Sequence, residues 1–255
     1  MNMIKIALYG KGGSGKSTTA AKLAAAWAEQ GLKVMQIGCD PKADSTILLR
    51  RGQKAETVLD LVRSGRDYGL DDMVRIGYAG VVCVEAGGPA PGLGCAGRGI
   101  IAALEKLKEK GAYERFTPDV VIYDVLGDVV CGGFSLPMRD GYADQVFIIT
   151  SGENMAIHAA ANIALAVENF RERGYARLGG LILNRRNVRD EEAKVAELAQ
   201  DIHSSVVGAL DRSETVQEAE ELGRTVLEAF PDSDMAAQYR ALADNVMAVC
   251  RKGRG

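Results

Sequence analysis

The sequence predicts a single α/β domain over residues 1–255, with a mostly parallel β-sheet and helices on both of its faces. Short runs rich in Val and Ile alternate with longer, Ala-rich amphipathic runs, as in successive βαβ units. The short runs are continuously apolar, which is typical of parallel strands buried on both faces. No linker, low-complexity tract or internal repeat interrupts the alternation, so we expect one domain.

Each expected element follows from the length and pattern of its run. Short apolar runs predict strands, and longer amphipathic runs predict the helices between them. In such sheets, ligands bind at the carboxyl ends of the strands. The expected strands are 4–9, 33–38, 81–85, 120–123, 145–150, 178–184 and 206–210, and the expected helices are 17–30, 57–63, 98–110, 154–173, 190–203, 215–222 and 234–251.

Composition excludes several classes of protein. With 47% hydrophobic residues and a net charge of −3, the chain is neither disordered nor a nucleic-acid binder that relies on bulk positive charge. A disulfide-stapled secreted module would be shorter and richer in cysteine. No cleavable leader or membrane-spanning run is visible, so we expect a cytoplasmic protein with reduced cysteines and no membrane partner.

Two counts are unusual, those of glycine and cysteine. The chain has 30 glycines, about 12% of its residues, where ~7% is usual. They gather after the first strand, around 87–99 and at 127–133, which indicates a role in local backbone geometry. The 5 cysteines are an odd number.

The first glycine cluster, Gly-Lys-Gly-Gly-Ser-Gly-Lys-Ser over 10–17, fits the phosphate-loop pattern G-x-x-x-x-G-K-[ST]. Glycines let backbone N–H groups converge on phosphate oxygens, and the following helix adds its positive end. The alternative is a turn that merely permits close packing, but the strand before and the helix after favour a P-loop NTPase fold. The expected nucleotide-binding residues here are Gly10, Lys11, Gly12, Gly13, Ser14, Gly15, Lys16, Ser17 and Thr18.

Three side chains of this loop have expected roles. Lys16 would neutralise the β- and γ-phosphates, and the Ser17 hydroxyl would ligate Mg²⁺. Lys11 is either a solvated surface lysine or a charge delivered to the phosphates of a partner subunit, in the manner of an arginine finger.

Carboxylates follow the expected strands. Asp124 ends the apolar run 120–124, the Walker B pattern, and would hold Mg²⁺ directly or through water. It also opens a D-x-x-G segment, in which the N–H of Gly127 can contact a γ-phosphate. Asp40 or Asp128 would position or deprotonate the attacking water, and Asp44 is a further candidate at the nucleotide. The alternative for these three acids is helix capping or turn formation.

Cys95 and Cys131 lie among glycines, whose N–H groups can hydrogen-bond to inorganic sulfide. A 4Fe–4S cluster takes four thiolates, and a two-fold dimer would supply both cysteines twice. On the residues alone, a shared cluster and two unligated cysteines both remain open. Cys39, Cys83 and Cys250 have apolar neighbours and are expected to be buried and structural.

The chain resembles the nitrogenase iron proteins and their close relatives. The likeness lies in residues 9–19, 38–46, 92–99 and 123–134, and continues through 178–182 to 239–243. It implies a homodimer that binds MgATP or MgADP in each subunit and shares one 4Fe–4S cluster through Cys95 and Cys131. It also implies electron delivery, driven by ATP hydrolysis, to a larger catalytic component, with a low-potential ferredoxin or flavodoxin as donor.

The resemblance also assigns individual roles. Arg98 matches an arginine that contacts the catalytic partner and is ADP-ribosylated in some members, although a plain surface arginine is the alternative. Asn184 matches an adenine contact, and Gln217 and Tyr239 match further contacts in a more divergent region.

Departures from the family pattern bear on the partner. The chain ends at Gly255 without the usual C-terminal extension, and Met235 and the segment 211–214 differ from nitrogenase. We therefore expect a nitrogenase-like system, of the methylthio-alkane reductase or nickel-tetrapyrrole cyclase type, or nitrogenase itself. The sequence Cys-Ala-Gly-Arg at 95–98 argues against the protochlorophyllide reductase branch. Alternatives are a partitioning-type ATPase, suggested by Lys11, and an iron–sulfur scaffold, although the C-x-x-C usual in scaffolds is missing.

Overall fold

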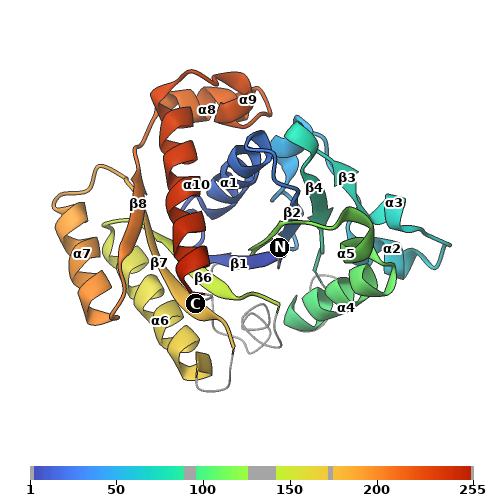
Figure 1. The fold of residues 1–255 in the computed structure, drawn as a ribbon, viewed down its shortest axis with the longest axis horizontal. Coiled ribbons are helices and arrows are strands. Elements are labelled where there is room, and N and C mark those ends of the chain that lie inside the picture. Colours follow the sequence, from blue (N-terminus) through green and yellow to red (C-terminus); the bar gives the residue numbers. More distant parts are fainter. Residues whose placement is uncertain (1–2, 89–95, 126–141, 172–174, 254–255) are drawn as a thin grey trace.

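The computed structural model describes residues 3–88, 96–125, 142–171 and 175–253. Their strands form one 8-stranded sheet in the order β3-β4-β2-β5-β1-β6-β7-β8 (Figure 1). Every pairing is parallel except that of β3 with β4, which confirms the predicted mostly parallel α/β fold. The strands are β1 (Ile4–Tyr9), β2 (Val34–Gly38), β3 (Arg75–Ile76), β4 (Val82–Glu85), β5 (Val120–Asp124), β6 (Gln145–Thr150), β7 (Arg177–Asn184) and β8 (Val206–Leu210).

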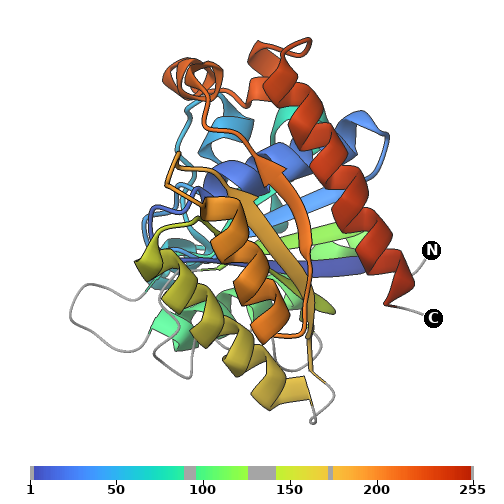
Figure 2. The same ribbon diagram turned by 90° about the vertical axis from the view of Figure 1, so that its left-hand side faces the viewer.

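Helices cover both faces of this sheet, as Figure 2 shows in side view. One face packs against α1, α8, α9 and α10, and the other against α2, α4, α6 and α7. The helices are α1 (Lys16–Glu29), α2 (Val58–Ser64), α3 (Leu70–Met73), α4 (Ala96–Glu109), α5 (Ala112–Phe116), α6 (Asn154–Arg171), α7 (Glu191–Asp201), α8 (Glu214–Glu221), α9 (Val226–Ala229) and α10 (Asp234–Lys252), with 3₁₀ turns η1 (Ile47–Arg50) and η2 (Tyr78–Gly80).

The central strands supply both cores, because successive side chains of a strand point to opposite faces. In β1, Ile6 and Leu8 join the core under α1 and α10, whereas Ala7 and Tyr9 join the opposite core. All four are fully buried. Because β1 is buried on both faces of the sheet, its sequence is a nearly continuous run of apolar residues.

The expected strands and long helices are present, with ends shifted by a few residues. The short elements β3, α3, α5 and α9 were not predicted, because two to five residues are too few to show a periodicity. β3 lies at the sheet edge, and its two side chains, those of Arg75 and Ile76, are exposed, so no run of buried apolar residues marks it in the sequence.

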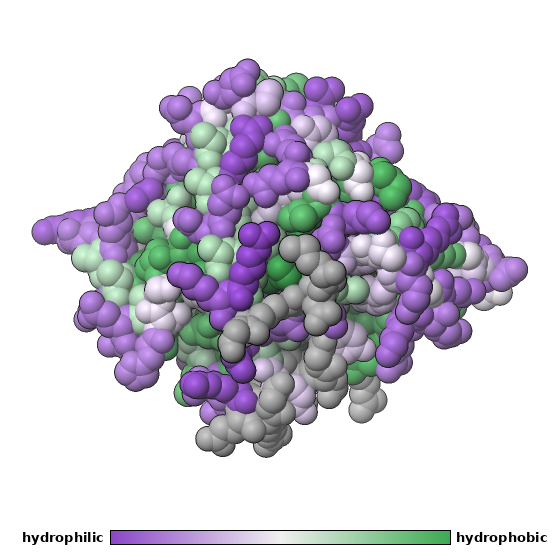
Figure 3. All heavy atoms as spheres, in the orientation of Figure 1, coloured by the Kyte–Doolittle hydropathy of each residue, from purple (hydrophilic) through white to green (hydrophobic). Residues whose placement is uncertain are grey.

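The surface in the view of Figure 1 is mainly hydrophilic, with apolar patches between the charged side chains (Figure 3). Within the described ranges, no helix is both long and apolar enough to cross a membrane.

Candidate nucleotide site

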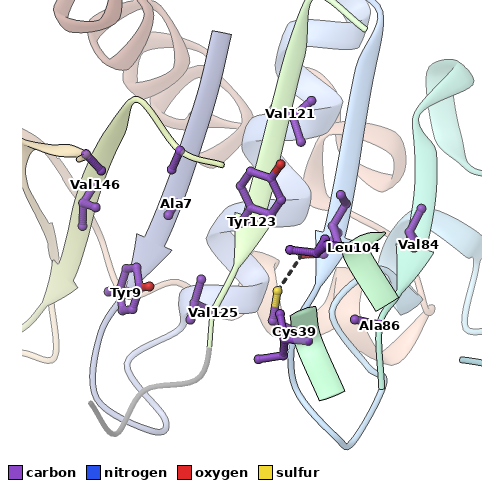
Figure 4. Packing of buried hydrophobic residues seen from close by; sticks show 14 of the residues in the cluster. Ala7, Tyr9, Cys39, Val84, Ala86, Leu104, Val121, Tyr123, Val125 and Val146 are labelled. Atoms are coloured by element: carbon purple, nitrogen blue, oxygen red, sulfur yellow. Dashed lines mark hydrogen bonds between the residues drawn. The ribbon is translucent and has the colours of Figure 1, made fainter. Parts of the chain in front are cut away.

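The predicted site residues meet at the carboxyl edge of β1, β5 and β2. In the sheet register, Asp124 lies opposite Leu8 on one side and Gly38 on the other. The backbone N–H of Cys39 donates to the Asp124 carbonyl at 2.9 Å, so the ends of β5 and β2 are joined directly. Figure 4 shows Val125 and Cys39 at this edge, just beyond the two strands.

The phosphate loop takes a shape that its glycines allow. Gly10 has φ 155° and Gly15 has φ 84°, and residues with a β-carbon rarely adopt these backbone conformations. A β-carbon at Gly10 would overlap the Ile149 carbonyl oxygen and lie 2.8 Å from the Ser14 hydroxyl. Gly15 is the N-cap of α1, whose first turn has neither an acidic residue nor a side-chain cap. The helix N-terminus therefore presents unpaired N–H groups to an anion.

Lys16 and Asp124 form a buried ion pair at this loop. Lys16 Nζ lies 2.7 Å from Asp124 Oδ1, and their side chains are 9% and 0% exposed. Asp124 Oδ2 has no hydrogen-bond partner among the described residues. An unpaired buried carboxylate oxygen is costly, so this atom fits a cation or a water held by one. The residues present thus suit Mg²⁺ and the phosphates that Lys16 would neutralise.

Three further side chains at this loop are half-buried. Ser17 and Thr18 are half-buried in the first turn of α1, and the Thr18 hydroxyl donates to Glu220 Oε1 at 2.8 Å. Lys11 is also half-buried. It borders a cavity of about 330 Å³ that Glu153 and Lys194 also line.

Two side chains at the end of β7 contact the phosphate loop, that of Asn184, the last residue of the strand, and that of Arg186 just beyond it. Asn184 Nδ2 donates to the Ser14 carbonyl at 2.7 Å, and Arg186 Nη2 donates to the Gly13 carbonyl at 2.7 Å. A β-carbon at Gly15 would overlap the Asn184 amide, which further explains the glycine. Asn184 thus holds the loop in shape, and its adenine contact stays a prediction. Arg186 was missed, because an arginine beyond a strand has no distinctive sequence signal.

The predicted adenine contacts occupy different environments. Gln217 is exposed on α8, whereas Tyr239 is buried in α10 with only 3% of its surface exposed. Lys22 Nζ lies 5.6 Å from the Tyr239 ring centroid and 3.3 Å from Glu220 Oε1. Burial lowers the pKa of Lys22 to about 8, although the nearby Glu220 carboxylate opposes this shift. Both adenine contacts stay predictions, and the buried Lys22 was not anticipated.

Asp40 and Asp44 lie on the segment after β2. Asp40 is half-buried, and its Oδ1 accepts the Lys42 backbone N–H at 2.9 Å, while the Ala43 N–H donates to its carbonyl at 3.0 Å. This is the turn-forming role that the sequence offered as an alternative. Asp44 is exposed. Their roles toward water and nucleotide stay predictions.

Several predicted residues fall outside the part of the chain that the structure describes. They are Cys95, Cys131, Gly127 and Asp128. Arg98 lies in the first turn of α4, and only its backbone is described. Val125, which directly follows β5, is the last described residue before the segment that contains Cys131.

The other three cysteines, Cys39, Cys83 and Cys250, are buried as predicted, and none of them forms a disulfide within the described residues. Cys39 Sγ lies 3.8 Å from the Ile37 carbonyl oxygen, the contact drawn as a dashed line in Figure 4. Burial raises the pKa of Cys83 to about 12 and raises that of Cys39 as well. Both sulfurs therefore remain protonated and are poor metal ligands. Within the described ranges, no cluster of His, Cys, Asp and Glu is arranged to hold a metal ion.

Comparison with known proteins identifies relatives over nearly the whole chain. The family described as 4Fe-4S iron sulfur cluster binding proteins, NifH/frxC family, matches residues 4–252. The nitrogenase iron protein of Methanospirillum hungatei is 52% identical over 249 residues, which cover 96% of this chain and 88% of that protein. The nitrogenase iron protein 2 of Methanothermobacter thermautotrophicus is 49% identical over 244 residues, which cover 96% of this chain and 89% of that protein.

Solved structures with a similar fold are more distant in sequence. The cell division ATPase MinD of Pyrococcus furiosus has a TM-score of 0.74 at 17% identity, covering 98% of this chain and 100% of that chain. The cobyrinic acid a,c-diamide synthase of Mycobacterium smegmatis, with bound ATP analogue and magnesium, has a TM-score of 0.71 at 18% identity, covering 99% and 97%. These likenesses concern the fold alone and confirm the predicted P-loop NTPase fold.

The family match over residues 4–252 includes both the phosphate loop and the two glycine-flanked cysteines, and the two nitrogenase iron proteins share about half of their residues with this chain. The resemblance predicted from the motifs is therefore confirmed. The chain belongs to the NifH/frxC family of 4Fe–4S iron–sulfur cluster binding proteins.

Proposed function

We propose that the protein is the ATP-hydrolysing reductase component of a nitrogenase or nitrogenase-like system. It would act as a homodimer that drives low-potential electron transfer with MgATP. The observation that carries this proposal is the buried pair of Lys16 with Asp124, whose second oxygen is unpaired, at a phosphate loop of a 4Fe–4S protein family.

At the nucleotide, each side chain has one proposed task. Lys16 exchanges its contact with Asp124 for the β- and γ-phosphates, which frees the carboxylate for Mg²⁺ together with the Ser17 hydroxyl. Asp40 or Asp128 orients the attacking water. Lys11 supplies a positive charge to the phosphates of the partner subunit.

The proposed cluster ligands are Cys95 and Cys131 of both subunits. Two thiolates per chain make the four that a 4Fe–4S cluster requires, and a two-fold axis brings them together. When bound, the cluster supplies a one-electron carrier of low potential. The three buried thiols at 39, 83 and 250 stay outside this set, which leaves the two glycine-flanked cysteines as ligands.

The proposed partners follow from the proposed reductase function. The electron acceptor is a larger catalytic component that docks near Arg98, and the donor is a low-potential ferredoxin or flavodoxin in the cytoplasm. Neither nucleic acid nor a membrane is part of the proposed cycle, consistent with the net charge of −3.

Trapping the complex tests this function. The tagged dimer is incubated anaerobically in extract of its source cells with MgADP and aluminium fluoride, which mimic the transition state of hydrolysis. We expect a stoichiometric catalytic component to co-purify, and its identity separates nitrogenase from methylthio-alkane reductase and nickel-tetrapyrrole cyclase. The matched control is the Lys16→Ala variant, which cannot hold the phosphates and is expected to capture nothing.

Two other outcomes would contradict the reductase function. Iron-free protein that binds liposomes or DNA when ATP is added would indicate a partitioning-type ATPase. Transfer of the intact cluster to an apo-acceptor, without electron transfer, would indicate an iron–sulfur scaffold.

A further inference from the structure

Glu85 is a buried acid at the end of β4 that no motif predicted. Its side chain is 0% exposed. Its Oε1 accepts the backbone N–H of Thr46 at 2.7 Å and the Thr46 hydroxyl at 2.5 Å. Arg50 Nε donates to the same hydroxyl at 3.0 Å, and Arg50 Nη2 lies 3.8 Å from Glu85 Oε1. Glu85 thus fixes the far end of the segment 40–46, which begins with Asp40 and contains Asp44.

The second carboxylate oxygen of Glu85 lies against the end of β2. Glu85 Oε2 has no hydrogen-bond partner among the described residues. A β-carbon at Gly38 would overlap this oxygen and would lie 2.5 Å from Cβ of Ser45. Because Gly38 has no β-carbon, the Glu85 carboxyl group fits between the end of β2 and the segment that contains Ser45. Both of these parts of the chain lead to the nucleotide site.

The residues that follow Glu85 are tied to the same segment. The Ala86 N–H donates to the Gly38 carbonyl at 2.8 Å. At Gly88, a β-carbon would overlap the Pro41 ring, which shows how closely the two loops pack. The segment 85–88 therefore contacts 38–46 at its start and again at its end, and the chain then continues toward Cys95.

Separating these segments is costly. The Thr46 N–H and hydroxyl would lose a buried acceptor, and the carboxyl group would lose both of its bonds. The charge state of Glu85 also depends on its surroundings. Burial raises the pKa of Glu85 to about 7, and the nearby Asp124 carboxylate contributes to this rise. A displacement of 40–46 would therefore pull on 85–88 through these contacts, against the bonds that 85–88 also makes with α2, where the Leu59 N–H donates to the Ala86 carbonyl at 3.2 Å.

We propose that Glu85 is a positioning residue that makes the segment 85–88, on the way to Cys95, follow the movement of the segment 40–46 when nucleotide binds. This inference deepens the proposed function and rests on it for its biological meaning. The coupling itself requires only nucleotide binding, so it is testable without iron or a catalytic partner.

Hydrogen–deuterium exchange on the full-length protein, with and without MgATP, measures the coupling. In the wild type, we expect MgATP to change the exchange of the amides of residues 86–88 at least threefold. Glu85→Leu is expected to abolish that nucleotide-dependent difference while retaining the change in 40–46. Glu85→Gln, whose side-chain carbonyl oxygen still accepts both hydrogen bonds from Thr46, is expected to keep at least half of the nucleotide-dependent difference at 86–88. Glu109→Leu, at an exposed acid of α4, is the matched control.

A merely structural role gives a different pattern. Glu85→Leu would then raise exchange at 86–88 equally in both nucleotide states and leave their ratio unchanged, which would overturn the proposal. If Glu85→Leu does not fold, Thr46→Val and Thr46→Ser decide. The coupling is supported if Thr46→Val loses the effect of MgATP on exchange at 86–88 while Thr46→Ser keeps it. The proposal is overturned if both variants keep the full effect. Absence of iron from the wild type would contradict the proposed function and leave this result intact.

Discussion

At the scale of single residues, the ionisation of Glu85 has a measurable effect on stability. Its pKa is 4.5 in an ordinary environment and about 7 in the fold, mainly because burial disfavours the carboxylate. Between these two pH values the folded protein keeps a proton that the unfolded chain has lost. The free energy of unfolding therefore falls as pH rises from 4.5 to 7, by about 3 kcal/mol through this group.

Glu85→Gln should remove this component of the pH dependence. The amide is neutral at every pH, so the variant is expected to gain up to about 3 kcal/mol relative to the wild type between pH 4.5 and pH 8. Urea denaturation at pH 5 and pH 8 checks the prediction, with the exposed Glu221→Gln as control. Parallel pH profiles for the wild type and Glu85→Gln would contradict it.

At the scale of secondary-structure elements, the end of β7 supports the phosphate loop through Asn184 and Arg186. Loops that bind phosphate need their N–H groups preorganised, and these two bonds fix the carbonyls of Gly13 and Ser14. The contribution of one such hydrogen bond is about 0.5–1.5 kcal/mol, equivalent to at most roughly tenfold in affinity.

Asn184→Ala is therefore expected to weaken MgATP binding by roughly three- to tenfold. Asn245→Ala is the matched control, because Asn245 Nδ2 makes a similar bond to the Val207 carbonyl at 3.1 Å, away from the loop. Calorimetric titration of both variants measures the dissociation constants. Equal affinities for Asn184→Ala and the wild type would show that the loop keeps its shape without the amide.

The elements also show what could be predicted from the sequence. Continuous apolar runs identified the buried strands, and the motif residues Lys16 and Asp124 form an ion pair that the sequence did not predict. Contacts that depend on the register between distant strands could not be predicted. Glu85 is an example, because its role arises only where β4 pairs with β2 and Gly38 leaves space for it. A two-residue edge strand such as β3 also lacks any pattern.

At the scale of the whole molecule, the proposed homodimer gives Lys11 a role that one subunit alone does not. Lys11 is half-buried and lines the cavity beside α6 and α7 with Lys194. In the proposed dimer, Lys11 would supply charge to phosphates across the subunit interface, as an arginine finger does.

Lys11→Ala is expected to retain the iron and the dimer yet lower MgATP hydrolysis by about 10³-fold or more. Lys194→Ala removes a positive charge from the same cavity without touching the phosphate loop and is expected to keep wild-type turnover. Phosphate release measured under anaerobic conditions compares the two. A Lys11→Ala variant with normal turnover would show that this lysine is a surface residue.

The cysteine arrangement gives the most direct test of the central claim, that a dimer of this chain holds one 4Fe–4S cluster. We expect anaerobically isolated protein to contain about four iron atoms per dimer. The iron should be lost in Cys95→Ser and in Cys131→Ser and retained in Cys250→Ser, whose thiol is buried in α10. Wild-type protein without iron, or full iron retention in Cys131→Ser, would contradict the account.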